Sequence, residues 1–253
     1  MTESGLFHIL LIAFAALSAI IFTVLLFVIA PYGRHVRSGW GPKINATAGW
    51  VIMESPAVIV FGICFLIGDR IENLAAIIFF VMWQFHYVHR TLIFPFRMRP
   101  GGKQMPIIIM ASGLFFNLVN GYLQGRYLFK LSEAYEIDWL INPRFVMGLL
   151  IFIAGIVMNF QSDGILRNLR KHGETGYKIP YGGLYKWISC PNYFGEIVEW
   201  TGWAAATWSL AGLIFALWTA ANLVPRAIAH HCWYQQNFAE YPKSRKVIIP
   251  FIY

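Results

Sequence analysis

Charged residues are scarce in this chain of 253 residues, making up 13% of it, whereas hydrophobic residues make up 58%. In soluble domains about a quarter of the residues are charged, so water is not the main solvent of this chain. The hydrophobic residues form long runs without the alternation of β-strands, and lipid-embedded backbone is satisfied only in helices or closed barrels. The composition therefore predicts an all-α integral membrane protein.

The chain also lacks the short motifs of several enzyme classes. Its three cysteines are isolated, which indicates neither a disulfide framework nor a zinc site. No G-x-G-x-x-G, G-x-x-x-x-G-K-[ST] or H-E-x-x-H pattern occurs. The longest polar connection, residues 161–192, is about as long as one βαβ unit and leaves no room for a separate nucleotide-binding domain. We therefore predict a single transmembrane domain over residues 1–253, with any cofactor inside the helical bundle.

Seven apolar runs have lengths that suit membrane crossing. They cover residues 5–30, 47–67, 74–96, 106–129, 144–160, 193–208 and 209–224. The first run is longer than a signal-peptide core and lacks a basic flank and a cleavage site, so we expect it to remain as a helix. The last two runs join almost without a loop.

Basic residues fall unequally on the connections between these runs. When each residue near the end of a run is counted with the connection at that end, sixteen of the twenty Lys and Arg residues belong to the connections after the first, third and fifth runs or to the carboxyl-terminal tail. The positive-inside rule places these connections in the cytoplasm. We therefore predict a seven-transmembrane-helix bundle with its amino terminus outside and its carboxyl terminus in the cytoplasm. The loops account for the net charge of +8, so no nucleic-acid partner is needed.

Glu54 lies about a third of the way into the second run. A carboxylate at that depth is costly and needs a cavity or a polar partner. Pro56 cannot donate to the carbonyl of Ile52, which predicts a kink beside the acid. Two interpretations remain open: a hydrogen bond that packs two helices, or a functional carboxyl group.

The third run ends in a cluster of polar and aromatic residues. Tyr87 and Arg90 are three residues apart and share one helix face. His86 and His89 have the spacing of a metal-binding pair, but no further ligand set is evident, so we predict no metal site. The alternative is a membrane-boundary belt of His, Tyr and Arg.

Polar residues at helical spacing continue near the fifth, sixth and seventh runs. They are Asn159, Asp163, Arg167 and Arg170, then Asn192, Glu196 and Glu199, and finally Arg226, His230 and Tyr234. Each set is expected on one helix face. The first set indicates either i,i+4 salt bridges or a site for a phosphorylated nucleotide, since guanidinium groups bind phosphate bidentately. Because all of these sets fall in the cytoplasmic half of the predicted bundle, they favour a hydrophilic pocket there.

Three segments carry a family resemblance: FHYVHRT at residues 85–91, NYFGE at 192–196, and EYPKSRK at 240–246, which is followed by IPF at 249–251. With these segments the chain resembles the steroid 5-alpha-reductases, particularly those of type 2. The resemblance extends over essentially the whole chain. Polyprenol reductases and very-long-chain enoyl-CoA reductases are weaker relatives and provide alternative substrate classes.

The resemblance implies a membrane enzyme that uses NADPH to reduce the C4=C5 bond of a 3-oxo-4-ene steroid. It assigns Glu54 and Tyr87 to polarisation of the 3-oxo group, and Trp50 and Arg90 to the substrate pocket. The cofactor contacts that it implies are Tyr32, Arg99, Asn159, Asp163, Arg167, Arg170, Tyr177, Asn192, Glu196, Arg226, His230 and Tyr234.

The chain departs from the family pattern in two places. Ser112 stands where the family member compared has an arginine, and this difference affects the expected steroid preference. The segment 99–106 is longer than its counterpart in the family, which affects the assignment of Arg99 as a cofactor contact. The expected partners are a steroid or steroid-like lipid enone and membrane lipid, with no obligate protein partner. We expect a multi-pass protein of a bacterial inner membrane or of the endoplasmic reticulum.

Two other classes remain as alternatives. Isoprenylcysteine and phospholipid methyltransferases carry His-Pro-x-Tyr-x-Gly near their cofactor, and the matching segment here is CPNYFG at residues 190–195, without the histidine. A lipid or proton carrier would use an intramembrane acid such as Glu54. Such a carrier does not explain the polar residues from Asn159 to Arg170.

Overall fold

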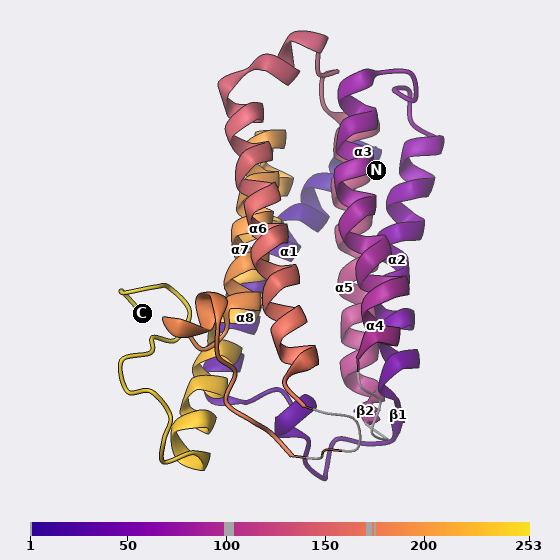
Figure 1. Cartoon of the computed structure of the whole chain (residues 1–253). Helices are drawn as coiled ribbons and strands as arrows, with labels where there is room; N and C mark the ends of the chain where they lie inside the picture. Colours follow the sequence, from indigo (N-terminus) through magenta and orange to yellow (C-terminus); the bar gives the residue numbers. More distant parts are fainter. Residues whose placement is uncertain (1, 99–103, 171–173, 175) are drawn as a thin grey trace. The chain divides into compact units, whose positions relative to one another are not determined.

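The computed structural model describes residues 2–98, 104–170, 174 and 176–253, and most of them are helical. Each predicted apolar run overlaps one long helix, although the helix in the run 74–96 ends at Val88 and those in the runs 144–160 and 209–224 continue to Asn168 and Asn237 (Figure 1). The long helices are α1 (Glu3–Phe27), α2 (Ala46–Leu66), α3 (Leu74–Val88), α5 (Ile107–Arg126), α6 (Pro143–Asn168), α7 (Pro191–Thr207) and α8 (Leu210–Asn237).

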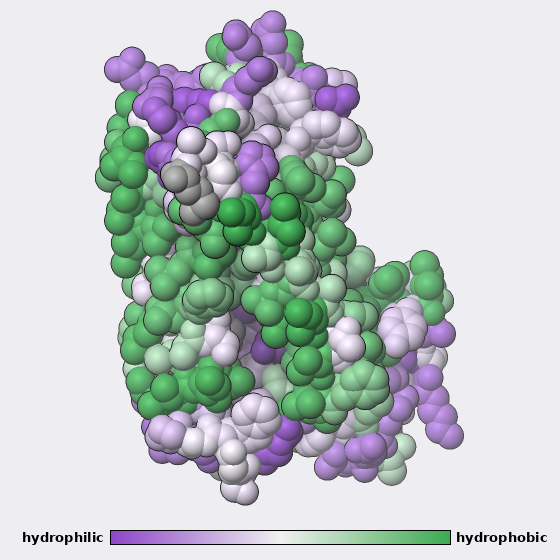
Figure 2. Space-filling view, turned by 180° about the vertical axis from the view of Figure 1, so that it is seen from behind, coloured by the Kyte–Doolittle hydropathy of each residue, from purple (hydrophilic) through white to green (hydrophobic). Residues whose placement is uncertain are grey.

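Five helical segments of the described chain are long and apolar enough to cross a membrane. They begin at Glu3, Ala46, Ile107, Pro143 and Leu210. Helices α3 and α7 have only 15 and 17 residues. In the space-filling view, hydrophobic side chains cover the middle of the helical surfaces and hydrophilic ones gather near the helix ends (Figure 2). The chain is therefore a multi-pass membrane protein, and the count of seven spans remains a prediction.

The chain divides into two compact units, each with its own set of helices. One comprises Met1–Phe14 and Pro31–Val146, and the other comprises Ala15–Ala30 and Met147–Tyr253. The first contains α2, α3, the short helix α4 (Phe94–Arg97) and α5, together with strands β1 (Lys43–Asn45) and β2 (Gln104–Pro106). The strands pair antiparallel with Ile44 opposite Met105. The second unit contains α6 from Met147 onward, α7 and α8.

In the first unit, α2 and α5 pack closely because α5 has small residues along one face. A Cβ atom on Gly113 would lie 3.0 Å from Sδ of Met53, and one on Gly125 would lie 2.6 Å from Cβ of Cys64. Gly121 lies between them and faces Pro56. Small residues four apart let two membrane helices approach until their backbones nearly touch. This contact surface, here called the α2/α5 seam, brings polar side chains on this face of α5 within reach of α2.

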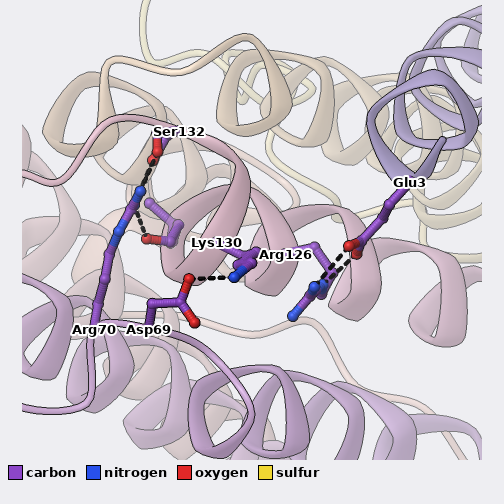
Figure 3. Close-up of polar contacts among 7 residues, drawn as sticks. Glu3, Asp69, Arg70, Arg126, Lys130 and Ser132 are labelled. Atoms are coloured by element: carbon purple, nitrogen blue, oxygen red, sulfur yellow. Dashed lines mark hydrogen bonds and ion pairs between the residues drawn. The ribbon is translucent and has the colours of Figure 1, made fainter.

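Arg70, in the loop after α2, anchors that loop to the end of α5 (Figure 3). Its guanidinium group donates to the carbonyl of Leu128 at 2.6 Å and to Oγ of Ser132 at 2.7 Å, and it also donates to the carbonyl of Ser132. Beside it, Asp69 pairs with Lys130. The hydrogen bond from Lys130 holds the pKa of Asp69 below its usual range.

The amino end of α1 is fixed to α5 by an ion pair. Arg126 donates from Nε and Nη2 to the two carboxylate oxygens of Glu3, at 2.5 and 2.8 Å (Figure 3). Two parallel bonds of this kind fix the orientation of both groups as well as their separation. Stacking of Phe7 on Tyr127 and of Phe14 on Phe116 continues the contact along the helix.

In the second unit, glycines bring α6 and α7 into backbone contact. A Cβ atom on Gly148 would lie 2.3 Å from the nitrogen of Ala206, and one on Gly202 would lie 2.3 Å from the nitrogen of Phe152. Gly155 and Gly195 make similar approaches. Each helix contributes two of these four glycines, seven residues apart, so they recur on one face. We call this contact the α6/α7 seam.

Helices α7 and α8 join as the sequence predicts, with almost no loop. Trp208 ends α7 in the left-handed conformation, at φ 44°. Ser209 then caps α8, its Oγ accepting a hydrogen bond from the backbone nitrogen of Gly212 at 2.9 Å. A side-chain acceptor at this position satisfies one of the unpaired N–H groups of the first turn.

Candidate active site

Pro56, two residues after Glu54, interrupts the hydrogen-bond ladder of α2. Because proline has no N–H, the carbonyl of Ile52 loses its helical donor. Oγ of Ser55 donates to that carbonyl instead, at 3.0 Å. The proline is thus accommodated inside a membrane helix without leaving a polar group unsatisfied.

Side chains of α3 and α5 also donate to carbonyls of α2 around the proline. Asn117 donates to the carbonyl of Met53 at 2.7 Å. Trp83 Nε1 donates to the carbonyl of Ala57 at 2.8 Å, and Gln84 Nε2 donates to that of Val58 at 3.0 Å. These bonds from two neighbouring helices fix the position of α2 at the depth of Glu54.

Glu54 is buried, with 8% of its surface exposed. Nδ2 of Asn117 donates to its Oε2 at 3.1 Å. This bond is the helix-packing contact that the sequence left open. A packing contact and a functional role are compatible, because a carboxyl group that acts on a substrate must itself be held in place.

Tyr87 is also buried, with 4% exposed. Its ring lies 4.6 Å from that of Trp83, centroid to centroid, one turn earlier on α3. Since Trp83 is itself bonded to α2, the position of the Tyr87 ring is set by the α2–α3 contact. The first unit therefore carries both proposed polarising residues on helices that are bonded to each other.

The proposed substrate residues Trp50 and Arg90 contact each other. The guanidinium carbon of Arg90 lies 4.8 Å from the ring centroid of Trp50 and 4.7 Å from that of Phe94. Trp50 is one helical turn before Glu54, and Arg90 is three residues after Tyr87. Arg90 belongs to a π-helical turn, His89–Ile93, and such turns are frequent at functional sites. The structure thus assembles Trp50 and Arg90 beside the segments that carry Glu54 and Tyr87.

Three proposed cofactor residues form a hydrogen-bonded chain at the α6/α7 seam. Nδ2 of Asn159 donates to the carbonyl of Asn192 at 2.9 Å, and Nδ2 of Asn192 donates to Oδ1 of Asp163 at 3.1 Å. A Cβ atom on Gly195 would lie 2.6 Å from the nitrogen of Asn159, so the glycine allows the approach. The chain links residues that are about thirty positions apart in sequence.

Arg170 departs from the predicted helix face, and that prediction was wrong. Helix α6 ends at Asn168, so Asn159, Asp163 and Arg167 share the helix but Arg170 lies beyond it. Its Nη1 donates to the carbonyl of Gly176 at 2.9 Å, and its guanidinium carbon lies 5.9 Å from the Tyr177 ring. The arginine therefore belongs to the loop after α6, together with Tyr177.

On α8, His230 and Tyr234 contact aromatic residues from elsewhere in the second unit. The hydroxyl of Tyr193 lies 3.1 Å from Nε2 of His230. The ring of Tyr234 stacks on that of Tyr241, with centroids 5.1 Å apart and planes 5° from parallel. Tyr177 makes an edge contact with Trp233, between these two positions on α8. The Arg170 loop and α8 therefore meet through Tyr177.

The remaining proposed cofactor residues lie in different places. Arg167 is in the last turn of α6, Glu196 is in α7, and Arg226 follows Pro225 in α8. Tyr32 belongs to the first unit, immediately before a short 3₁₀ turn. Arg99 is outside the described residues.

Ser189 organises a network that sequence reasoning did not identify. Its Oγ lies 2.6 Å from Nδ1 of His231 and 2.7 Å from the hydroxyl of Tyr241, and it donates to the carbonyl of Lys246 at 3.0 Å. Burial raises the pKa of Tyr241. The network fastens the carboxyl-terminal segment to the start of α7 and to α8, whose residues at 230 and 234 are proposed cofactor contacts.

Arg245 is buried against this network, with 3% exposed. Its guanidinium group lies 4.9 Å from the ring of Tyr241 and 5.4 Å from that of Tyr181. Its Nε and Nη1 have no hydrogen-bond partner within the described parts of the chain. The sequence placed this arginine in a family segment but gave no sign that it is buried.

Comparison with known proteins decides the family. Residues 103–253 match the family described as 3-oxo-5-alpha-steroid 4-dehydrogenase. The steroid 5-alpha-reductase DET2 of Gossypium hirsutum is 43% identical over 256 residues, covering 100% of this chain and 99% of the relative. The chain belongs to the steroid 5-alpha-reductase family. Its predicted enzyme class, an oxidoreductase of that family, is thereby confirmed.

Mammalian relatives match over most of their length as well. The 3-oxo-5-alpha-steroid 4-dehydrogenase 1 of Macaca fascicularis is 46% identical over 88% of this chain and 84% of its own. The human protein of the same name is 45% identical over 88% of this chain and 86% of its own. These relatives carry the type 1 name, so the expected particular likeness to type 2 remains a prediction. Membership of the steroid 5-alpha-reductase family sets aside the methyltransferase and the carrier.

Proposed function

We propose that this steroid 5-alpha-reductase family member transfers a hydride from NADPH to the C4=C5 bond of a 3-oxo-4-ene steroid. The observation that carries the proposal is the pair of buried groups, Glu54 and Tyr87, on two helices that are hydrogen-bonded to each other. Relatives named for steroid 5-alpha-reduction support the substrate class.

The proposed role of Glu54 and Tyr87 is polarisation of the 3-oxo group. Negative charge develops on that oxygen as hydride adds to C5, and hydrogen-bond donors in a water-excluded site stabilise it. The hydroxyl of Tyr87 is such a donor, and Glu54 acts either as a neutral donor or as a pair with Tyr87. C4 then takes a proton from Tyr87 or from water.

The side chains of the second unit suit a phosphorylated dinucleotide. They combine guanidinium groups for phosphates, amides and a carboxylate for hydroxyl groups, and aromatic rings for stacking. Arg245 supports this assignment, since a buried guanidinium group with unpaired N–H atoms needs an acceptor. Bound NADPH would supply the hydride, and Asn159, Asp163, Asn192, Arg170 and His230 would hold it.

The proposal includes a topology. Seven helices would cross the membrane, with the amino terminus outside and the carboxyl terminus cytoplasmic, as one reductase domain over residues 1–253. The basic residues around Arg167 and Arg226 would then face the cytosolic nicotinamide pool. The membrane is that of the endoplasmic reticulum or a bacterial cell, and the reaction requires no protein partner.

The test uses the purified full-length protein in detergent. We expect NADPH to bind, and its absorbance to fall when a 3-oxo-4-ene steroid is added, with a product two mass units heavier than the substrate. Polyprenal and a trans-2-enoyl-CoA serve as comparison substrates. Faster turnover of either would reassign the substrate, and binding of NADPH without oxidation by any of the three would refute the proposal.

A further inference from the structure

Asn117 is a polar residue of the α2/α5 seam at the depth of Glu54. It stands four residues after Gly113 and four before Gly121, so it lies on the face of α5 that packs against α2. The position is 3% exposed. A buried amide in lipid is costly unless it is hydrogen-bonded, so its bonds indicate why it is there.

The two bonds made by Asn117 determine the orientation of its amide. Nδ2 lies 2.7 Å from the carbonyl of Met53, which only accepts, so the atom at that position must be the NH₂ group. Its second hydrogen then points to Oε2 of Glu54, at 3.1 Å. Asn117 therefore donates to Glu54, and Oε2 is an accepting oxygen.

We infer that Asn117 is a positioning residue for Glu54, an inference that rests on the proposed function. Because Asn117 donates both to the backbone carbonyl of Met53 and to the side chain of Glu54, it fixes the plane of the carboxyl group relative to the backbone of α2. With Oε2 accepting from Asn117, the proton of a neutral Glu54 resides on Oε1. Asn117 thus selects which oxygen of Glu54 acts on the substrate and keeps that oxygen turned away from α5.

The first experiment compares Asn117→Ala with Asn120→Ala. Asn120 is a matched control, since it is fully buried on the same helix and its Oδ1 accepts a hydrogen bond from Nε2 of Gln124, at 3.4 Å. We expect Asn117→Ala to lower kcat by about ten- to a hundredfold, the value of one hydrogen bond to an ionisable group. The KM for NADPH should change by less than about twofold, and Asn120→Ala should leave kcat near that of the wild type.

The second experiment asks whether the effect passes through Glu54. In a Glu54→Gln background, Asn117→Ala should produce no further loss of kcat, because the group that it positions is gone. The infrared band of the Glu54 carboxyl group, identified as the band lost in Glu54→Gln, should shift in Asn117→Ala and stay in place in Asn120→Ala. If Asn117→Ala does not fold, Asn117→Ser fits the same seam and should show the same changes.

The two ideas fail in different ways. A wild-type protein that binds NADPH but reduces no enone refutes the proposed function, while the infrared comparison still tests Asn117. An active wild type with unchanged kcat and an unshifted band in Asn117→Ala overturns the inference alone. Equal losses in Asn117→Ala and Asn120→Ala would also overturn it, because they would indicate a general packing effect.

Discussion

A Cβ atom on Gly155 would lie 2.3 Å from the backbone nitrogen of Glu199, so α6 and α7 touch through their main chains at this point. One turn further along α6, Asn159 donates a hydrogen bond across the same seam to the carbonyl of Asn192. The separation of the two helices therefore sets the geometry of the proposed cofactor contacts.

This contact predicts that Gly155→Ala destabilises the protein by about 3 kcal/mol, the upper range for overpacking, because the clash is with backbone that cannot rotate away. Gly164→Ala is the control on the same helix, since the nearest atom to its Cβ would be 3.8 Å away. Thermal unfolding in detergent measures both. A similar Tm for the two variants would contradict the role of the α6/α7 seam.

Glu54→Gln and Tyr87→Phe are each expected to lower kcat by about a hundredfold to a thousandfold, the typical effect of losing one oxyanion donor. NADPH binding should be nearly unchanged, since both residues belong to the first unit and most of the proposed cofactor residues belong to the second. If the two act together, the double variant should be scarcely worse than the worse single one. Normal turnover in either folded, NADPH-bound single variant would show that the chemistry lies elsewhere.

NADPH should be preferred to NADH, because the basic residues of the connections predicted to be cytoplasmic and the buried Arg245 supply more cations than a pyrophosphate requires. The comparison is kcat/KM with each cofactor at a saturating concentration of steroid. Equal efficiency with both cofactors would contradict this prediction.

Arg70→Ala should lower the free energy of unfolding by about 1–2 kcal/mol, because it removes bonds from a charged donor to Leu128 and Ser132 (Figure 3). Lys130→Ala, which removes the exposed pair with Asp69, should change stability very little. Denaturation in detergent at one ionic strength measures both variants. The opposite order of effects would show that Arg70 does not hold the loop.

The proposed topology predicts that reporters fused at Met1 and Tyr253 lie on opposite sides of the membrane. An odd number of crossings is required by the unequal distribution of Lys and Arg. Reporters on the same side would exclude seven spans and would mean that α3 or α7 does not cross.

The sequence by itself determined the membrane class, the positions of the long helices and the family. Long apolar runs are unambiguous because lipid permits so few backbone structures. The sequence also placed Glu54 and Pro56 in one helix and predicted the short join at Trp208 and Ser209. Each of these features depends on residues that are close together along the chain.

The tertiary structure decided which groups meet across helices. From the helical spacing of the polar residues, the sequence predicted that the polar face of α6 continues to Arg170. The helix instead ends at Asn168, and Arg170 donates to the carbonyl of Gly176 in the loop. Asn117 gave no signal in the sequence, because a single amide in an apolar run has no meaning until the glycines on either side bring α5 against α2. Which polar group a buried carboxyl contacts depends on how closely two helices approach, and that distance is set by packing between segments far apart in the chain.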